Sequence, residues 1–317
     1  MKLCVAGASG AFGLKHLDAL SAIKEAEVVS VVGSPKDNLE TFAKGRNIPH
    51  WSNDLAESLS ISEVDGVILA TPTQLHATQA IQCLEAGKHV MVEIPMADKL
   101  ADAEKLVETQ QRTGLIAMGG HTRRFNPSHQ WIHNKIKAGE LNIQQMDVQT
   151  YFFRRSNMNA MGKPRSWTDH LLWHHACHTV DLFQYQTGEV ASRVQALQGP
   201  IHPDLGIAMD MSIGMKVPSG AICTLSLSFN NDGPFGTFFR YICDNGTYIA
   251  RYDDLVDGNE NTIDLTGVAI SKNGIELQDR EFISAFHEGR EPNASVRQCL
   301  PAMQTLDKIE KCLEANA

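Results

Sequence analysis

The seven residues Gly7–Gly13, which read GASGAFG, constrain the possible folds of this chain more than any other stretch. They follow a short apolar run, Lys2–Ala6, and precede Leu14–Leu20, whose apolar residues have the spacing of a helix. Glycines allow a backbone to approach a pyrophosphate closely, and a helix N-terminus offers it unpaired N–H groups. A strand, a glycine turn and a helix in this order therefore predict a dinucleotide-binding unit. The spacing is GxxGxxG, one residue longer than the commoner GxGxxG, so a plain strand-to-helix turn stays an alternative.

Later apolar runs repeat the pattern of a strand followed by a helix. The β-branched run Val28–Val32 stands where the second strand of a dinucleotide-binding domain belongs. Further runs at Val67–Ala70, His89–Glu93 and Leu115–Met118 lie between helical segments. Strands that alternate with helices favour a doubly wound parallel sheet. We therefore expect an α/β fold in which residues 1–120 form a Rossmann domain.

The second half of the chain has a different pattern. Ile143–Phe153 alternates as a strand, and four β-rich runs follow it, at Arg193–Gln198, Met209–Val217, Ala221–Ser228 and Phe238–Cys243. Consecutive strands joined by short turns imply an antiparallel sheet. Residues 121–317 are therefore predicted to form a second α/β domain, which binds the substrate on a large, mainly antiparallel open sheet. The amphipathic segment 296–313 is expected to be a closing helix that can pack back on the first domain.

The end of the second strand discriminates between NAD and NADP. An acidic side chain there accepts hydrogen bonds from the ribose 2′-OH and repels a 2′-phosphate. Here the chain reads VGSPK from Val32, and Ser34 and Lys36 can both donate to a phosphate, so NADP is the predicted cofactor. Asp37 argues for NAD, because a small change in turn geometry would bring it close. Lys36 could also be an ordinary surface charge.

Two later loops are predicted to belong to the same site, because ligands of doubly wound sheets bind beyond the carboxyl ends of the strands. One is ATPTQLH, which ends at His76, and the other is Glu93-Ile94-Pro95. Ordinary turns in which proline stops a strand are the alternative for both. The predicted cofactor contacts are Gly7, Ser9, Gly10, Ala11, Phe12, Ser34, Lys36, Thr71, Pro72, Thr73, His76, Glu93 and Ile94.

The net charge of the chain indicates which partners it can bind, and its cysteines indicate its cellular compartment. Asp and Glu outnumber Lys and Arg by 37 to 28, which gives a net charge of -9 and argues against a nucleic-acid partner. An anionic substrate would need a local basic pocket. The seven cysteines show no CxxC spacing, as expected for free thiols in the cytoplasm. We expect no membrane partner, because no apolar run approaches the length that spans a bilayer.

Four of the 13 histidines lie in the stretch SWTDHLLWHHACHTVD. On a helix, His170, His174 and His178 would share one face with Asp181 further along it, whereas His175 would point elsewhere. Imidazole titrates near neutral pH, so this stripe can supply a general base, a proton shuttle or metal ligands. A buried histidine that bonds only to the backbone is the ordinary alternative.

The spacing of two of these histidines, His-x₃-His, also suits a zinc pair. However, no HExxH motif occurs, His175 stands where its glutamate would be, and no cysteine pair completes a site. We therefore predict no metal centre.

Four motifs together carry a family resemblance, namely GASGAFG, ATPTQLH, GKHVMVEIP and the HxxxHxxD of His174–Asp181. Over nearly its whole length the chain resembles the glucose-fructose oxidoreductase, inositol dehydrogenase and rhizopine-catabolism (Gfo/Idh/MocA) family of NAD(P)-dependent oxidoreductases. This resemblance implies a homodimer that associates through the open sheets of the second domain. Longer stretches, such as PRSWTDHLLWHHACHTVDLF, resemble one branch of the family. That branch implies NADP-dependent oxidation of the cyclic hemiacetal of an aromatic ring-cleavage semialdehyde, which gives a pyrone dicarboxylate.

Two departures from the family pattern bear on the mechanism. The family usually has Glu-Lys-Pro, with the lysine near the nicotinamide, where this chain has Glu93-Ile94-Pro95, so the base must come from elsewhere. His174 takes a position often held by an acid, which removes negative charge from a site expected to hold a dicarboxylate. We expect His178 to accept the hydroxyl proton while hydride leaves the same carbon, with Asp181 orienting it. His174 is expected to contact the substrate or to share the proton.

Arginines are the candidates for binding the two substrate carboxylates, because guanidinium binds carboxylate bidentately. Neighbouring side chains diverge, so one member of each Arg-Arg pair is expected to face inward. The alternative for any one arginine is a solvated surface charge, and isolated aromatic residues are more often core. The predicted substrate contacts are Arg123, Arg124, Arg154, Arg165, Trp167 and His175, with Arg155, Lys163, Trp173 and Phe125 as further candidates.

Two other functions stay open. The chain could be a dehydrogenase of the same family that acts on another cyclic polyol, a sugar or a dihydrodiol. Such a substrate has no carboxylates for the arginines to bind. A non-catalytic NADP-binding sensor would bind the cofactor without reducing it, because a cofactor turn indicates binding and not turnover.

Overall fold

The computed structural model describes residues 1–34, 38–158, 162, 164–165, 169–269 and 274–315. The chain divides into two compact units. One contains Met1–His121 and Ile275–Leu300, and the other contains Thr122–Gly274 and Pro301–Ala317. The sequence predicted a single boundary near residue 120. The return of residues 275–295 to the first unit was not expected, because an amphipathic helix does not reveal which sheet it covers. The closing helix expected at 296–313 is divided between the two units after Leu300.

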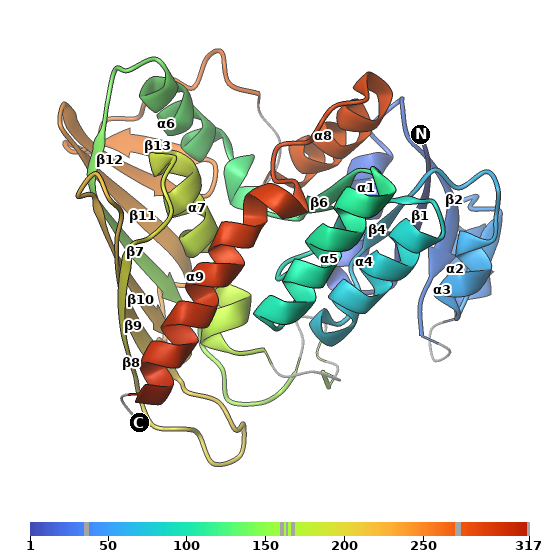
Figure 1. Ribbon diagram of the computed structural model, residues 1–317, viewed down its shortest axis with the longest axis horizontal. Helices are drawn as coiled ribbons and strands as arrows, with labels where there is room; N and C mark the ends of the chain where they lie inside the picture. The colour runs from blue at the N-terminus through green and yellow to red at the C-terminus, as the bar shows by residue number, and fades with distance from the viewer. Residues whose placement is uncertain (35–37, 159–161, 163, 166–168, 270–273, 316–317) are drawn as a thin grey trace. The chain divides into compact units, whose positions relative to one another are not determined.

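The first unit contains a six-stranded parallel sheet in the order β3-β2-β1-β4-β5-β6 (Figure 1). This confirms the predicted doubly wound sheet. The strands are β1 (Lys2–Ala6), β2 (Glu27–Val32), β3 (His50–Ser52), β4 (Gly66–Leu69), β5 (His89–Val92) and β6 (Ala117–Gly119). The helices between them are α1 (Ala11–Leu20), α2 (Leu39–Lys44), α3 (Leu55–Leu59), α4 (His76–Glu85) and α5 (Leu100–Thr113). Only the short β3 had no counterpart among the predicted strands.

The order of these strands contains the switch point at which doubly wound sheets bind their ligands. The strands β1 and β4 are neighbours, yet the connection from β1 leads away to β2 on its other side. Loops that leave neighbouring strands in opposite directions open a crevice at the carboxyl ends, which is where doubly wound sheets bind ligands. The strands β1, β4 and β5 are almost wholly buried, as expected for apolar runs covered on both faces by helices.

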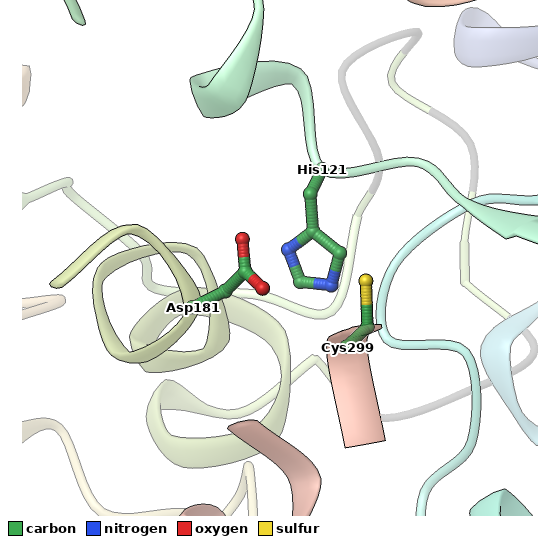
Figure 2. A group of neighbouring side chains, drawn as sticks. All are labelled: His121, Asp181 and Cys299. Carbon is green, nitrogen blue, oxygen red and sulfur yellow. The ribbon is translucent and has the colours of Figure 1, made fainter. Parts of the chain in front are cut away.

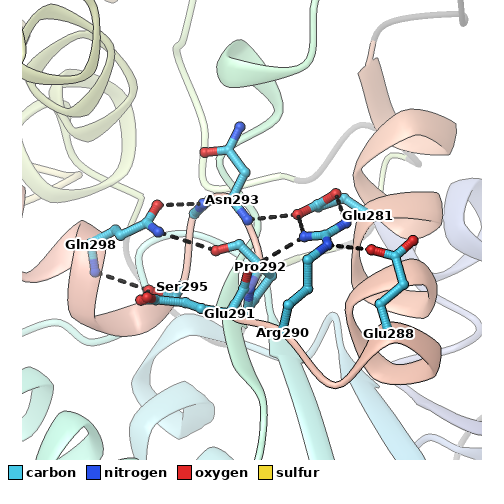
Figure 3. A network of polar contacts seen from close by, with 9 residues as sticks. Glu281, Glu288, Arg290, Glu291, Pro292, Asn293, Ser295 and Gln298 are labelled. Carbon is cyan, nitrogen blue, oxygen red and sulfur yellow. Dashed lines mark hydrogen bonds and ion pairs between the residues drawn. The ribbon is translucent and has the colours of Figure 1, made fainter.

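Helix α8 (Ile275–Glu288) packs against α1 and leads into a polar connection that ends at α9 (Val296–Ala315). Figure 3 shows how this connection is fixed. Arg290 donates to both carboxylate oxygens of Glu281, at 2.6 and 2.9 Å, and Glu281 also accepts from the backbone N–H of Asn293 at 2.7 Å. The N–H of Gly119 donates to the carbonyl of Ala294 at 2.8 Å, so the connection extends the edge of the sheet beside β6.

The second unit contains a seven-stranded open sheet in the order β13-β12-β11-β7-β10-β9-β8. All neighbours are antiparallel except β7 and β10, which confirms the predicted mainly antiparallel sheet. The strands are β7 (Ile143–Tyr151), β8 (Arg193–Gln198), β9 (Asp210–Lys216), β10 (Ile222–Ser228), β11 (Gly236–Cys243), β12 (Gly246–Arg251) and β13 (Asp254–Asp257). The sequence prediction lacked β12 and β13.

One face of this second sheet is covered and the other is open. The helices α6 (Pro127–Lys137) and α7 (Cys177–Thr187) lie side by side and pack on the sheet (Figure 1). Along β9 and β10 buried and less buried residues alternate, which is the pattern of a sheet with one solvated face. Among the described helices, none has both the length and the apolar character needed to cross a membrane.

Candidate active site

The glycine turn after β1 is built so tightly that only glycine fits at two of its positions. Gly7 has a φ of +78°, and a Cβ on it would lie 2.3 Å from the carbonyl oxygen of Ala70. A Cβ on Gly13 would lie 2.2 Å from the carbonyl oxygen of Gly7. The N–H of Gly7 donates to the carbonyl of Val32 at 2.8 Å, which ties the turn to the end of β2. The turn therefore brings bare backbone to the carboxyl edge of the sheet.

The N-terminus of α1 faces this turn and can receive a phosphate. Its N-cap residue, Gly10, has no side chain to cap the helix, and no acidic residue occupies the first turn. The N–H groups of the first helical residues, Ala11 and Phe12, are among those that a helix start leaves without an intrahelical partner. These residues fit an anionic dinucleotide. Ser9 is half-buried beside them and Phe12 is 48% exposed.

The end of β2 is described only in part. Ser34 is exposed and follows β2, which is the neighbour of β1 in the sheet. Lys36 and Asp37 lie outside the described residues. The choice between NADP and NAD that the sequence assigned to this turn therefore stays a prediction.

The loops after β4 and β5 are joined by His76. Its ring is buried, with Nδ1 2.8 Å from the carbonyl oxygen of Pro95 and Nε2 2.8 Å from that of Thr71. Pro72 is half-buried and Thr73 buried in the first loop, while Ile94 is half-buried in the second. The structure thus brings both predicted loops together at the carboxyl edge of the sheet, with one imidazole between them.

Glu93 is buried rather than open to a ligand. Its Oε1 lies 3.0 Å from Nε2 of His16, a residue of α1. Burial alone would raise the pKa of this carboxyl, but the hydrogen bond and charge of His16 outweigh burial and lower the pKa. Glu93 was predicted as a cofactor contact, and the structure gives its carboxylate a buried histidine as partner.

The histidine stretch forms a π-helix, Leu171–Ala176, that continues into α7. A regular helix was expected, and π-turns are rare and frequent at functional sites. His170 precedes the π-helix in an extended conformation, and its backbone N–H donates to Nδ1 of His174 at 3.1 Å. The two rings lie 4.5 Å apart. The structure therefore confirms these two histidines as neighbours, although not as parts of one regular helix.

The surroundings of His174 favour a neutral imidazole with its proton on Nε2. Burial, together with the nearby His170, lowers the pKa of His174 to about 3. Because Nδ1 accepts the backbone N–H of His170, the single ring proton sits on Nε2. His174 can therefore donate a hydrogen bond from Nε2, but it is a poor proton acceptor near neutral pH.

His178 and Asp181 lie on α7, and Asp181 is paired with an arginine. The carboxylate of Asp181 accepts from Nε of Arg124 at 2.8 Å and from Nη2 of Arg124 at 2.6 Å, with both side chains buried. The sequence assigned Asp181 to orienting His178 and Arg124 to the substrate. Figure 2 shows Asp181 projecting from its helix. His178 is half-buried, one turn earlier on α7.

Three predicted substrate contacts meet at one carboxylate that the sequence analysis did not single out, Asp169. Nη2 of Arg154 binds one of its oxygens, Nη2 of Arg165 lies 3.3 Å from that oxygen, and Nε2 of His175 lies 2.9 Å from the other. Burial alone would raise the pKa of Asp169, but His175 and Arg154 outweigh burial and hold it well below its usual range. The cluster therefore brings two guanidinium groups and an imidazole to one carboxylate.

The remaining candidates separate into core, surface and undescribed residues. Arg123 is half-buried, donates to Oδ1 of Asn126 at 3.2 Å and lies over the ring of Tyr252. Arg155 is exposed and Arg154 is half-buried, so one member of this pair faces inward, whereas neither Arg123 nor Arg124 is exposed. Trp173 and Phe125 are buried in the core, and Trp167 and Lys163 lie outside the described residues.

Two buried residues that take part in ion pairs, Asp169 and His16, were not predicted from the sequence. Asp169 stands four residues after Arg165, a spacing typical of ion pairs. This spacing is the sequence pattern that could have revealed it. His16 lies on the apolar face of α1 with Gly13, Leu17 and Leu20, where a histidine at a core position is unusual.

A third unpredicted feature is a buried imidazole beside a buried thiol in the first unit. Figure 2 shows His121, directly after β6, next to Cys299 at the start of α9. A ring nitrogen of His121 and the sulfur of Cys299 lie within 4.8 Å. These two residues lie far apart in the sequence, so their spacing gives no signal.

Two family models match the two halves of the chain. The model described as "Oxidoreductase family, NAD-binding Rossmann fold" (GFO_IDH_MocA) matches residues 1–121, and "Bacterial oxidoreductases, C-terminal" matches residues 127–269. The predicted dinucleotide-binding domain is therefore confirmed as an NAD-binding Rossmann fold.

Curated relatives support the same assignment at two levels of similarity. The chain is 64% identical over 314 residues to 4-carboxy-2-hydroxymuconate-6-semialdehyde dehydrogenase of Sphingobium sp., with 99% of each chain covered. It is 32% identical over 139 residues to scyllo-inositol 2-dehydrogenase (NAD⁺) of Bacillus subtilis, which covers 44% of this chain and 41% of the relative.

Solved structures share the fold at low sequence identity. An oxidoreductase from Agrobacterium radiobacter, in complex with NAD⁺, L-tartaric acid and magnesium, superposes with a TM-score of 0.85 at 16% identity, covering 100% of this chain and 97% of the other. An aldose-aldose oxidoreductase from Caulobacter crescentus gives a TM-score of 0.87 at 17% identity, covering 100% and 98%.

Proposed function

Because the chain belongs to the Gfo/Idh/MocA family of oxidoreductases, we propose that it oxidises the cyclic hemiacetal of 4-carboxy-2-hydroxymuconate-6-semialdehyde to 2-pyrone-4,6-dicarboxylate with NADP. This is a step of protocatechuate 4,5-cleavage. The observation that carries the proposal is the 64% identity, over 99% of both chains, to the Sphingobium dehydrogenase of that name. The alternatives are a cyclic polyol, a sugar or a dihydrodiol as substrate.

The charge at Asp169 supports a dicarboxylate substrate. Arg154 and Arg165 share one buried carboxylate, so two guanidinium groups lie close together at this point. Burial lowers the pKa of Arg165, which indicates a guanidinium partly removed from water. A substrate carboxylate would give these guanidinium groups a further charged acceptor, which a polyol or sugar does not offer. We assign the substrate carboxylates to Arg165 and Arg154, with His175 beside them.

The cofactor is held by the glycine turn and the loops beyond the sheet. Gly7 and the start of α1 would take the pyrophosphate, and Thr71, Thr73 and Ile94 would border the nicotinamide half. Ser34 and Lys36 would take the 2′-phosphate, which favours NADP over NAD. When bound, the nicotinamide supplies the hydride acceptor.

The two reactive histidines have different tasks. The hemiacetal carbon loses a hydride to the cofactor, and its hydroxyl loses a proton. The C–OH group thereby becomes the C=O of a lactone, and the ring stays closed. His178 accepts that proton. His174 donates from Nε2 to a substrate oxygen, because its Nδ1 is occupied by the backbone N–H of His170. Arg124 and Asp181 hold each other on the same unit and keep the first turns of α7 in place.

The open face of the second sheet is the surface that we assign to a second copy of the chain. Leu197 on β8 is 70% exposed and Ile222 on β10 is 39% exposed. Apolar side chains on an uncovered sheet favour a partner. We therefore propose a homodimer, and a cytoplasmic location that suits an enzyme using NADP.

The test is NADPH formation, followed by absorbance, when the purified protein meets freshly prepared protocatechuate 4,5-ring-cleavage product and NADP. Parallel samples contain NAD instead of NADP, or scyllo-inositol instead of the ring-cleavage product. Rapid reduction of NADP with the ring-cleavage product alone is the expected result. Reduction with scyllo-inositol instead would assign a polyol substrate, and binding of NADP without reduction of any kind would favour a sensor.

A further inference from the structure

A histidine at the centre of the first unit is held between two carboxylates. The ring of His16 is completely buried. Its Nδ1 lies 2.9 and 3.1 Å from the two carboxylate oxygens of Asp279, on α8. Its Nε2 lies 3.0 Å from Oε1 of Glu93, at the end of β5. Both ring nitrogens therefore face anionic acceptors, and both bonds form only when both nitrogens carry protons.

The pKa shifts of His16 and Glu93 agree with a doubly protonated ring, whereas burial raises the pKa of Asp279. Burial alone would lower the pKa of His16, but Asp279 and Glu93 outweigh burial and raise it to about 10. An imidazolium between two carboxylates leaves the cluster one negative charge in the interior. Such an arrangement is costly to bury unless its hydrogen bonds are complete, so it is a feature for which a function is expected.

The cluster fixes Glu93 from several sides. Nε2 of Gln278 donates to Oε1 of Glu93 at 3.3 Å, and the N–H of Ile94 lies 3.4 Å from Oε2. A Cβ on Gly120 would lie 2.8 Å from Oε1, so the glycine there leaves the carboxylate its space. The Glu93 side chain therefore has little room to change its conformation.

The position of Glu93 links the cluster to the cofactor site. His16 belongs to α1, whose N-terminus forms the predicted pyrophosphate site, and Glu93 begins the loop that continues to Pro95. That loop is tied in turn to Thr71 through the ring of His76. Hydrogen bonds at its two ends, joined by the chain from Glu93 to Pro95, thus connect the glycine-turn helix to both loops at the carboxyl edge of the sheet.

We propose that His16 is a positioning residue, whose imidazolium holds the Glu93–Pro95 loop at a fixed place relative to helix α1 and so sets the geometry of the nicotinamide half of the cofactor site. In this chain the loop has isoleucine where the family pattern has lysine, so it contributes shape rather than an amine. The proposal rests on dinucleotide binding in the proposed function and is independent of the substrate.

The charge of the ring is tested on the cofactor-free protein. In ¹⁵N-histidine-labelled protein at pH 8.5, the ring signals that disappear in His16→Gln are expected to be those of a doubly protonated imidazole. An ordinary histidine, with a pKa near 6.5, is neutral at this pH. A neutral His16 ring at pH 8.5 would overturn the proposal whatever the substrate is.

The positioning role is tested by NADPH binding, followed by nicotinamide fluorescence. His16→Gln removes the charge and is expected to raise the dissociation constant of NADPH by about 10-fold or more, the usual loss for a charged hydrogen bond. Glu93→Gln is expected to do the same, and the double variant to be no worse than either single one, because the two residues act as a unit.

A matched control separates positioning from general damage to the fold. His129→Gln replaces another fully buried histidine, whose Nδ1 lies 2.8 Å from the hydroxyl of Tyr241 in the second unit. This variant is expected to lose stability but to bind NADPH normally. Equal losses of NADPH affinity in His16→Gln and His129→Gln, or unchanged affinity in both His16→Gln and Glu93→Gln, would contradict the proposal. If His16→Gln does not fold, Glu93→Gln carries the binding test.

Discussion

Asp181 binds the guanidinium of Arg124 through both carboxylate oxygens, at 2.6 and 2.8 Å, with 1% and 3% of the two side chains exposed. The pair lies within one unit and joins the start of that unit to helix α7, which carries His178. The two parallel hydrogen bonds form the bidentate geometry, which adds both energy and directional specificity to an arginine–carboxylate pair.

Asp181→Asn is expected to lower the free energy of unfolding by about 3–5 kcal/mol, because it leaves a buried guanidinium without its counter-charge. Urea unfolding measures this loss. Glu40→Gln is the control, since it breaks an exposed pair with Lys44 and is expected to change stability by at most about 0.5 kcal/mol. Similar effects of the two substitutions would show that the buried pair contributes no more than a surface one.

His178→Ala is expected to fold normally, by circular dichroism, and to lose about 10²- to 10⁴-fold in turnover, the usual range for a removed general base.

His174→Asn is expected to slow turnover but to keep the acid limb of the pH profile of kcat/KM. The reason is that the pKa of His174 is lowered to about 3, so its ring stays neutral across the working range. If the acid limb is lost in His174→Asn but kept in His178→Asn, then His174 is the proton acceptor and His178 is not.

Arg165→Gln is expected to raise KM for the dicarboxylate by about 10- to 100-fold, because it removes a charged hydrogen-bond donor from the substrate. Arg155→Gln is the matched control. Arg155 is exposed and donates to the side chain of Asn230, so its removal is expected to leave KM nearly unchanged. Steady-state kinetics with the two variants side by side give the comparison. An equal rise in both would indicate a general effect of surface charge.

Gly7→Ala is expected to abolish NADPH binding and to destabilise the first unit. It adds both a left-handed backbone strain and a clash, because its Cβ would lie 2.3 Å from the carbonyl oxygen of Ala70. Gly87→Ala separates the two effects, since Gly87 has nearly the same φ, +77°, with no atom within 4 Å of the added Cβ. It is expected to cost only about 1–2 kcal/mol and to bind NADPH normally.

The free energy of unfolding of the wild-type protein, measured relative to His16→Gln, is expected to fall as the pH rises from about 7 to 10. The pKa of His16 is about 10 in the folded protein and ordinarily 6.5, so its stabilisation is complete below 6.5 and is lost as the pH rises through 10. Asp279 from α8 and Glu93 after β5 face the ring, and Gln278 from α8 donates to Glu93. The slope approaches about 1.4 kcal/mol per pH unit for one proton. A pH-independent difference between the two proteins would mean that the ring is neutral.

The local features of the fold were predictable from the sequence. The apolar run Lys2–Ala6 and the glycines after it determine a strand and a turn by interactions between near neighbours, so β1 and its turn were predicted at the right residues. The alternation along 143–153 likewise predicted β7. Very short strands such as β3, at His50–Ser52, give too few residues for a period to be recognised.

The partners of buried charges could not be predicted in the same way. The spacing of Asp181 pointed to His178, and nothing in it pointed to Arg124, 57 residues away, which donates to the Asp181 carboxylate. His16 and Asp279 are 263 residues apart, and nothing in the spacing of either one points to the other. The π-helix also escaped prediction, because its sequence carries the same apolar and histidine spacing as a regular helix.

The most direct test of the account is the identity and amount of the product when the enzyme, NADP and the freshly made ring-cleavage semialdehyde react to completion. Chromatography with mass detection is expected to find 2-pyrone-4,6-dicarboxylate and NADPH in a one-to-one ratio, because hydride leaves the cyclic hemiacetal carbon and the ring stays closed. NADPH accompanied by the open-chain tricarboxylate would mean that the aldehyde hydrate is the substrate. No NADPH at all, from protein that binds NADP, would contradict the proposed dehydrogenase reaction.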